Sequence, residues 1–262
     1  AGAYKIFGHH YEVIWILQAF LHAFTAYLVY LLGAKIFQEN GKKIGLIAAT
    51  FIGLHPDLIE ISAMLMTETF YLFFVTLVIW IFVKLFEEPD KFKYTIFLSL
   101  TTAVAILSRP PVILFVPIIL VYYFINKRYK MAIIFLAGIG LVLAPWIIRN
   151  YLIYHQFILT TIIGEYNLWV GNTLNSKGGQ IAGGFNPLPS YTDIHGFFNL
   201  KQKASQEFWS FAFAYPFIFI KLCIIRIIRY FSLIRPMGFW FYQTGIKQMI
   251  FVIFSGVSIA FL

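Results

Sequence analysis

The stretch that decides the fold is Met131–Ile148, which reads MAIIFLAGIGLVLAPWII and contains no charged side chain. A helix rises about 1.5 Å per residue, so roughly 20 apolar residues cross a hydrocarbon core of about 30 Å. Three other predominantly apolar runs have a similar length: Ile14–Phe37, Thr69–Phe86 and Phe208–Ile228. The sequence therefore predicts several membrane-spanning helices.

Shorter apolar runs lie at Ile44–His55, Tyr94–Leu107 and Val112–Ile125, and another, Met249–Leu262, ends the chain. A short run crosses the bilayer if it borrows flanking residues, tilts, or lies partly within protein. We therefore expect an all-α, polytopic transmembrane helical bundle of about seven to eight spans, the eighth of them incomplete. Because the chain also begins Ala-Gly-Ala without Met, we expect it to be truncated at both ends.

The composition excludes a water-soluble protein. Hydrophobic residues make up 60% of the 262 and charged residues 12%, with a mean hydropathy of +0.80, whereas a soluble domain carries about 25% charged residues. The formal charge of +9 does not indicate nucleic-acid binding, because the basic residues form short clusters between apolar runs and no continuous stripe. With Cys223 as the one cysteine, neither a disulfide framework nor a cysteine metal site is available.

The distribution of lysine and arginine predicts the orientation. With the N-terminus outside, twelve basic residues fall on the inner side: Lys35, Lys42, Lys43, Lys84, Lys91, Lys93, Lys127, Arg128, Lys130, Arg226, Arg229 and Arg235. The outer side receives Lys5, Arg109 and Arg149, together with the lysines of a long loop. We expect a multi-pass protein of the bacterial plasma membrane whose long loop and active site face outward.

That loop, residues 150–207, separates two predicted helical regions, residues 1–149 and 208–262. It is rich in Gly, Asn, Pro and Ser around residues 164–190, and its repeated aromatics favour order. A loop this long beside a bundle is usually functional or disordered. The loop is therefore the place where we expect an external functional region.

A short amphipathic helix is predicted at the end of this loop, over Asn199–Phe211. Its pattern directs Phe208, Trp209 and Phe211 toward lipid and the charged residues toward water. Pro216 follows inside the next predicted span, where neighbouring helices make a kink tolerable. The chain is thus expected to pass from the surface helix directly into the membrane.

Three acids, Asp57, Glu60 and Glu68, crowd the predicted outer mouth of the bundle. Ionisable groups at a membrane boundary are costly unless paired or hydrated, which makes them candidates for function. For Glu68 a catalytic role and a charge favoured by a helix N-terminus both stay open. For Asp57 and Glu60 a solvated or capping role is the first interpretation, and Asp57 is kept as the second catalytic candidate.

Two arginines lie at the same predicted interface, Arg109 in LSRPP and Arg149 in APWIIRN. The planar guanidinium suits a phosphate, and a lipid phosphate sits at this depth. Snorkelling of the side chain to the head groups explains Arg109 equally well and is the first interpretation for Arg149. Both remain candidate phosphate-binding residues.

The stretch Gly164–Asn172, reading GEYNLWVGN, combines aromatic rings and amides, which hold a sugar by stacking and hydrogen bonds. The same residue types also make ordinary turns. The six histidines show no metal-ligand spacing, so we assign no metal ligand. P-loop, dinucleotide-binding and nucleophile-elbow motifs are absent from the sequence.

Taken in order, these stretches resemble the GT-C class of membrane glycosyltransferases, especially the bacterial relatives of protein O-mannosyltransferases and of the lipid A aminoarabinose transferase. The matching pieces are Phe7-Gly8 with the helix of Gln18, His55-Pro56 leading to Thr67-Glu68, Ser108-Arg109-Pro110, Ala144-Pro145-Trp146 with Arg149-Asn150, Tyr166–Asn172, and Ala204 to Tyr215-Pro216. The resemblance implies transfer of a sugar from a polyprenyl or dolichyl phosphate carrier to a glycan, lipid or protein acceptor, with inversion at the anomeric carbon.

The resemblance also implies roles for individual residues. Glu68 matches the family's second external acid, which is expected to position substrate or a metal. Arg109 and Arg149 would stabilise the departing phosphate, and Asn167 and Asn172 would line the sugar or carrier site. The family's principal acid lies in an earlier external loop, which is expected upstream of Ala1.

Two other functions stay open, a transporter or flippase and a noncatalytic membrane subunit. The sugar, the acceptor and a dependence on a divalent metal are open as well, since one or two carboxylates with water would hold magnesium. The transferase hypothesis requires Glu68, Arg109 and the Gly164–Asn172 stretch to meet at one face of the bilayer.

Overall fold

The computed structural model describes residues 5, 8, 10–89, 91–155, 157–161, 163–176, 194–231 and 245–260, and these residues form helices with no strand among them. The helices are α2 (Tyr11–Ile36), α3 (Gly41–Gly53), α4 (Pro56–Ser62), α5 (Glu68–Glu87), α6 (Phe92–Ser108), η1 (Pro110–Leu114), α7 (Phe115–Ile125), α8 (Tyr129–Tyr154), α9 (Ile163–Gly171), α10 (Ile194–Ala214), α11 (Pro216–Tyr230) and α12 (Ile246–Ala260). The expectation of an all-α membrane protein is confirmed.

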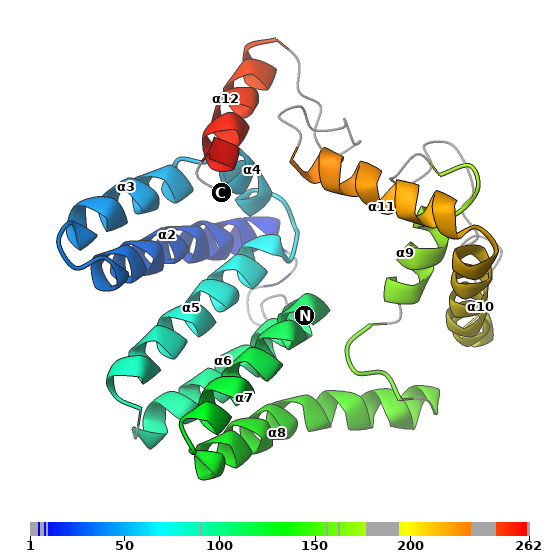
Figure 1. Ribbon diagram of the computed structural model, residues 1–262, viewed down its shortest axis with the longest axis horizontal. Coiled ribbons are helices and arrows are strands. Elements are labelled where there is room, and N and C mark those ends of the chain that lie inside the picture. Colours follow the sequence, from blue (N-terminus) through cyan, green and yellow to red (C-terminus); the bar gives the residue numbers. More distant parts are fainter. Residues whose placement is uncertain are drawn as a thin grey trace. The chain divides into compact units, whose positions relative to one another are not determined.

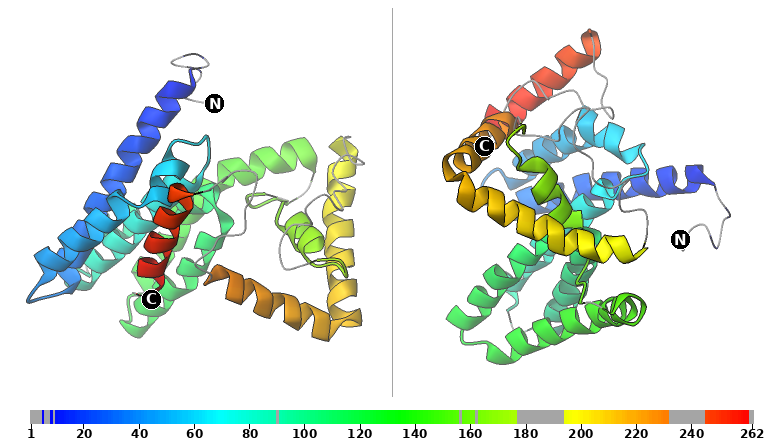
Figure 2. Two further views of the ribbon diagram at one scale, coloured as in Figure 1. Left: turned by 90° about the horizontal axis from the view of Figure 1, so that it is seen from above. Right: turned by 90° about the vertical axis from the view of Figure 1, so that its right-hand side faces the viewer.

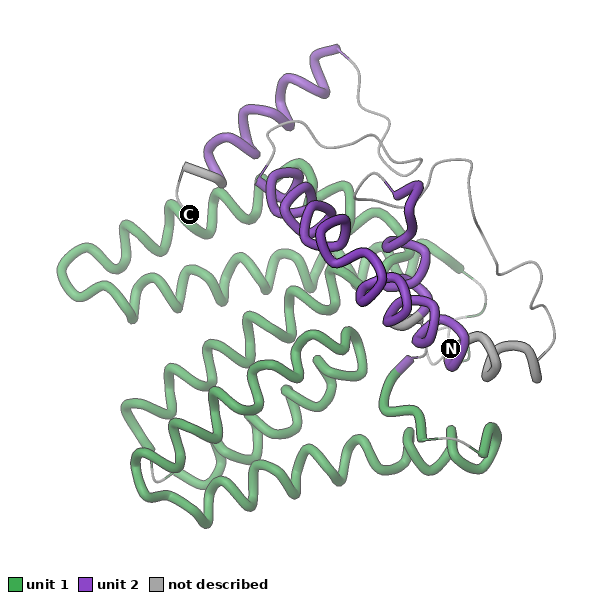
Figure 3. The backbone as a smooth tube through the Cα atoms, turned by 45° about the vertical axis from the view of Figure 1, so that its right-hand side comes forward, with its two compact units in different colours: residues 1–160 green, residues 161–262 purple. Residues whose placement is uncertain are grey.

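The chain divides into two compact units, unit 1 of residues 1–160 and unit 2 of residues 161–262 (Figure 3). The boundaries expected from sequence differ from this division. The expected boundary after residue 149 falls inside α8, and the one after residue 207 falls inside α10. Helix α8 continues to Tyr154 and stops at His155, which adopts a left-handed conformation with φ 55°.

The helices of unit 1 run back and forth across the unit, so that their connections gather at two ends (Figure 1). Residues 37–40, 88, 89, 91 and 126–128 form the first end, which we call the lysine-rich end. Nine basic residues belong to it: Lys35, Lys42, Lys43, Lys84, Lys91, Lys93, Lys127, Arg128 and Lys130. The connection at residues 63–67, Arg109 and the last turns of α8 form the other, which we call the Arg109 end.

Helices α2 and α3 pack tightly because glycines replace side chains where their backbones meet. A Cβ atom on Gly45 would lie 2.5 Å from the Tyr30 carbonyl oxygen, and one on Gly33 would lie 2.5 Å from the Gly45 Cα. Small residues that let helix backbones approach are the usual means of helix packing in membranes. This hairpin then packs through α2 against α5.

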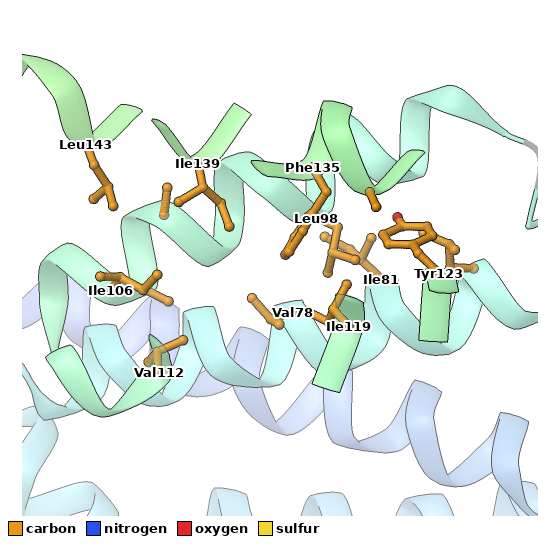
Figure 4. Packing of buried hydrophobic residues seen from close by; sticks show 14 residues of the cluster. Val78, Ile81, Leu98, Ile106, Val112, Ile119, Tyr123, Phe135, Ile139 and Leu143 are labelled. Carbon is orange, nitrogen blue, oxygen red and sulfur yellow. The ribbon is translucent and has the colours of Figure 1, made fainter. Parts of the chain in front are cut away.

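The core of unit 1 is built by α5, α6, η1, α7 and α8. Leu98 and Ile106 of α6 face Phe135, Ile139 and Leu143 of α8 at helical spacing (Figure 4). The fully buried Tyr123 hydroxyl lies 2.9 Å from Thr95 Oγ1, which satisfies both polar groups inside the core. Apolar packing and this internal hydrogen bond hold the helices that carry the Arg109 end.

Among the described residues three helices, α2, α5 and α8, are long and apolar enough to cross a membrane, and the number rises to as many as five if each of two bent helix pairs is one span. The expected seven to eight spans are reached only if the shorter apolar helices Phe92–Ser108, Pro110–Ile125 and Ile246–Ser258 cross as well. One expected span is strongly bent. Phe208–Ile228 is broken, with a bend of 105° between residues 202–214 and 216–230, because Pro216 has no N–H and cannot continue α10.

In unit 2, α9 packs against α10, and α10 meets α11 almost at a right angle (Figure 2, yellow and orange). The expected helix over Asn199–Phe211 exists as part of the longer α10. Its expected orientation is wrong, because Phe208 and Phe211 are each 8% exposed and only Trp209, at 52%, is open. The Phe208 ring packs on Phe219 of α11, with ring centroids 5.8 Å apart.

Candidate functional site

An ion pair joins two helices at the Arg109 end. Arg109 Nη2 donates to Glu68 Oε1, across 41 residues of sequence. Glu68 is the first residue of α5, and Arg109 follows the last residue of α6 in an extended conformation, as expected for a residue before proline. The Glu68 and Arg109 side chains are 29% and 42% exposed, so a ligand can reach both.

Neighbouring groups hold this pair in place. The Tyr71 ring, one turn along α5, lies 6.0 Å from the Arg109 Cζ, within the range of a cation–π contact. Gln18 of α2 is 5% exposed, and its Nε2 donates to the Met66 carbonyl at 2.6 Å, just before α5 begins. Glu68 therefore occupies a helix N-terminus and is also paired with Arg109, and its catalytic role stays a prediction.

Arg149 is oriented by α8 itself. Its Cζ lies 5.3 Å from the Trp146 ring, and its Nη1 donates to Asn150 Oδ1 at 3.1 Å. Asn150 is 3% exposed and donates through Nδ2 to the Ile158 carbonyl at 3.3 Å. The buried amide thus links the arginine to the chain that follows α8.

Both arginines lie at the same level of unit 1. Helices α6 and α8 run in the same direction, because Thr95 contacts Met131 and Ser99 lies beside Gly138. From that second contact Arg109 is about ten residues further along and Arg149 about eleven, a rise of roughly 15 Å along either helix. Glu68, Arg109 and Arg149 therefore share the Arg109 end.

Asp57 does not share the exposure of Glu68. It lies in the first turn of α4, which packs against α2, α3 and α5, and it is 1% exposed. A solvated role for Asp57 is thus wrong, and in this arrangement its carboxylate cannot touch a substrate. Glu60, on the same short helix, is half-buried.

Asn167 and Asn172 differ in what their amides can do. Asn167 is exposed on α9, whereas Asn172 is 2% exposed. Asn172 Oδ1 accepts from Arg226 Nη1 at 2.9 Å, and its Nδ2 donates to the Leu168 carbonyl at 2.7 Å. The Arg226 guanidinium also donates to the Gly171 carbonyl, so Asn172 and Arg226 join α9 to α11.

This contact corrects one feature of the expected topology. The distribution of basic residues placed Arg226 on the inner side and the Gly164–Asn172 stretch on the outer side, yet the two are hydrogen-bonded. Bonded groups cannot lie on opposite faces of a bilayer. The bend at Pro216 is the reason, because it returns α11 to α9 instead of carrying it straight on from α10.

The meeting of all three predicted elements stays a prediction. Glu68, Arg109 and Arg149 belong to unit 1, and the Gly164–Asn172 stretch belongs to unit 2. Within the described part of the chain, no group of three or more His, Cys, Asp or Glu side chains is arranged to hold a metal ion.

Sequence reasoning assigned no site role to Gln18 or Tyr71, and it did not predict the hydrogen bonds of Arg226. Gln18 carried one signal, since it is an amide inside the apolar run Ile14–Phe37. Tyr71 carried none, because an aromatic in an apolar helix is ordinary.

The family found by comparison with known proteins covers most of unit 1. A family model described as dolichyl-phosphate-mannose-protein mannosyltransferase matches residues 1–149, more than half of the chain. An uncharacterized protein of Aquifex aeolicus (strain VF5) is 24% identical over 168 residues, which cover 62% of this chain and 33% of that protein. The chain thus spans about a third of the length of this relative. No solved structure matches the chain at a significant level.

Proposed function

Because this chain belongs to the dolichyl-phosphate-mannose-protein mannosyltransferase family of GT-C membrane glycosyltransferases, we propose that the protein moves a sugar from a polyprenyl-phosphate carrier to a glycan, lipid or protein acceptor. The proposed place is the outer face of a bacterial plasma membrane, and the Arg109 end is the proposed active face. The observation that carries the proposal is the accessible Glu68–Arg109 pair inside the matched region.

In the proposed step the acceptor oxygen or nitrogen attacks the anomeric carbon from the face opposite the carrier. The bond between the anomeric carbon and the phosphate oxygen breaks, and the phosphate keeps the electron pair and leaves as polyprenyl phosphate. The acceptor loses its proton to a base. One displacement of this kind inverts the anomeric configuration.

Arg109 is proposed to receive the charge that grows on the departing phosphate. A guanidinium has five N–H donors, so one edge can stay on Glu68 while the other meets a phosphate oxygen. Donors fixed before the reaction stabilise developing charge without reorganising, and Glu68 and Tyr71 supply that fixation. Arg149, held over Trp146, is proposed as a second phosphate ligand.

The amides of α9 are proposed to divide their roles. Asn167 is exposed and is the better candidate for hydrogen bonds to a sugar. Asn172 would first have to release Arg226 and the Leu168 carbonyl, so it serves better to hold α9 in place. No step here is routed through a metal.

The test is release of polyprenyl phosphate from a lipid-linked sugar carrying a radiolabel in the carrier, catalysed by the purified complete gene product in detergent. We expect turnover by the wild type and a loss of about 100-fold or more in Arg109→Ala, the scale for removal of one preorganised donor. Undiminished turnover in Arg109→Ala would remove the site assignment. A flippase or a noncatalytic subunit would leave the lipid-linked sugar intact, and that result would remove the proposed function.

A further inference from the structure

The outward face of α11 is a continuous apolar surface. Phe217, Ile220, Ile224, Ile227 and Ile228 are 86%, 53%, 52%, 59% and 65% exposed. Their spacing of three and four residues places them along one side of the helix. The opposite side carries Leu222, which is 3% exposed, and Arg226, which is bonded to α9.

We propose that α11 lies in the plane of the bilayer, at the boundary between head groups and acyl chains, and does not cross the membrane. The occupant of its apolar face is the lipid bilayer. The inference is independent of the transferase chemistry, because it concerns only how unit 2 meets the membrane.

The length of α11 disfavours a crossing. Its 15 residues span about 22 Å, against about 30 Å of hydrocarbon. Helix α10 cannot add the missing length, because the two axes diverge by 105°.

Arg226 makes a crossing costly as well. It is tied to Asn172 Oδ1 and to the Gly171 carbonyl, which also accepts from Ser176 Oγ at 2.7 Å. A spanning α11 would carry the guanidinium and this polar end of α9 toward the hydrocarbon, where charged and polar groups are expensive. A helix lying in the interface keeps them on its water side.

The basic residues of α11 match a lipid surface. Lys221 and Arg229 are both exposed. At about 100° per residue, Lys221 lies at one edge of the apolar face and Arg229 lies on the opposite, polar side of the helix. Basic residues beside an apolar face are typical of helices that bind phosphate head groups while their apolar side enters the bilayer by about 5–10 Å. Charge and apolar pattern therefore point to the same partner.

Helix α10 has the opposite distribution. Its apolar residues Phe208 and Phe211 pack inside unit 2, and its exposed polar residues include Gln202, Lys203, Gln206 and Glu207. With α11 in the interface, α10 stands nearly upright and points these residues into water. The exposed aromatics of α10, Trp209 and Phe213, lie in its last two turns beside the bend, at the level where interfacial aromatics gather.

The test is the depth of nitroxide spin labels, measured from collisions with oxygen and with a water-soluble nickel chelate. Labels are placed singly by Phe217→Cys, Ile220→Cys, Ile224→Cys and Ile228→Cys, in a Cys223→Ser background and in vesicles containing anionic lipid. A label at Leu141→Cys, on the exposed middle of α8, serves as the deep reference, because Leu141 is 74% exposed in a membrane-spanning helix.

We expect the four α11 labels to lie at one shallow depth of about 5–10 Å, much closer to the membrane surface than the label on α8. A depth that changes steadily by about 16 Å from Phe217 to Ile228, as the helix rise requires for a crossing, would overturn the proposal. Immobile labels that meet neither oxygen nor nickel would also overturn it, because they would show protein on this face.

Discussion

Helix α5 is held by an ion pair at each end, and the two pairs differ in their surroundings. At the lysine-rich end Lys35 bonds Glu87, with side chains 17% and 52% exposed. Lys84 lies 3.9 Å from Glu87, and a second pair, Glu88 with Lys91, follows at once. At the Arg109 end Glu68 bonds Arg109, and the further neighbour of the guanidinium is the Tyr71 ring.

The two ends of α5 differ in whether neighbouring charges can replace a lost ion-pair contact. At the lysine-rich end several like charges surround each acid, so the loss of one contact is readily compensated, as is usual for surface ion pairs. At the Arg109 end one carboxylate orients one guanidinium that is open to a ligand. Similar chemistry therefore serves as support at one end of α5 and as a candidate site at the other.

The largest expected effect separates these two acids. Glu68→Gln should lower the rate of polyprenyl-phosphate release by about 100-fold or more, because the group that orients Arg109 is lost. Glu87→Gln, the matched change at the other end of the same helix, should stay within about twofold. Initial rates at saturating lipid-linked sugar measure both, and equal losses in the two variants would erase the distinction between the ends.

The second expected effect concerns the register between α6 and α8, which sets the level of both arginines. A Cβ on Gly138 would lie 2.2 Å from Ser99 Oγ and 2.8 Å from Ser99 Cβ, whereas one on Gly140 would meet nothing within 4 Å. Gly138→Ala should therefore destabilise the protein by about 1–3 kcal/mol, the usual cost of overpacking.

Gly140→Ala is the control on the same helix, and it should be neutral or stabilising by up to about 1 kcal/mol. Thermal unfolding in detergent, followed by circular dichroism, compares the two variants. If Gly138→Ala unfolds at or above the midpoint of Gly140→Ala, the contact between α6 and α8 is not tight.

A smaller effect is expected when Arg109 keeps its charge but loses its shape. Arg109→Lys should reduce kcat/KM by about tenfold, since an ammonium cannot contact a carboxylate and a phosphate through a planar fork. Most of the loss should appear in kcat if the contact strengthens as the phosphate departs. A change confined to KM would instead indicate that Arg109 only binds the carrier.

The smallest effect is expected for the Glu88–Lys91 pair. Lys91 lowers the pKa of Glu88 from its ordinary 4.5, and Glu88 raises that of Lys91 from 10.5. The contribution of Glu88 to the free energy of unfolding is present above pH 4.5 and is lost as pH falls through its lowered pKa. The contribution of Lys91 to the free energy of unfolding is present below pH 10.5 and is lost as pH rises through its raised pKa.

Both groups are solvated, so Glu88→Gln should leave the unfolding midpoint unchanged within error between pH 5 and 9. Unfolding scans at several pH values, with the wild type alongside, measure this. A clearly lower unfolding midpoint in Glu88→Gln would mean that neighbouring charges at the lysine-rich end do not compensate for the lost pair.

Membrane residence and the helical class were readable from the residues, as were Glu68 and Arg109 as candidates. Their pairing was not, because the two lie 41 residues apart and the distribution of basic residues predicted a shared outer side without saying which side chains meet there. Gln18 shows the same limit, since an amide in an apolar run signals a partner without naming Met66. Asn172 shows the limit as well, because an amide that suits a sugar suits a helix end equally well.

Arg226 shows where local reading fails. A rule that counts charges beside apolar runs assumes straight spans, and Pro216 ends that assumption by turning the chain through 105°. Phe208 and Phe211 were assigned to lipid for a related reason. Their apolar pattern marks a face to be buried, and the sequence does not say whether lipid or protein covers it.

By itself the sequence determined that this protein lives in lipid and is built from helices, because the length and hydropathy of an apolar run are properties of neighbouring residues. Tertiary structure alone decided which charges meet, which acid is accessible and which asparagine is already bonded. Those outcomes depend on how helices far apart in the chain pack, and ion pairs act over a few ångströms that no local pattern encodes.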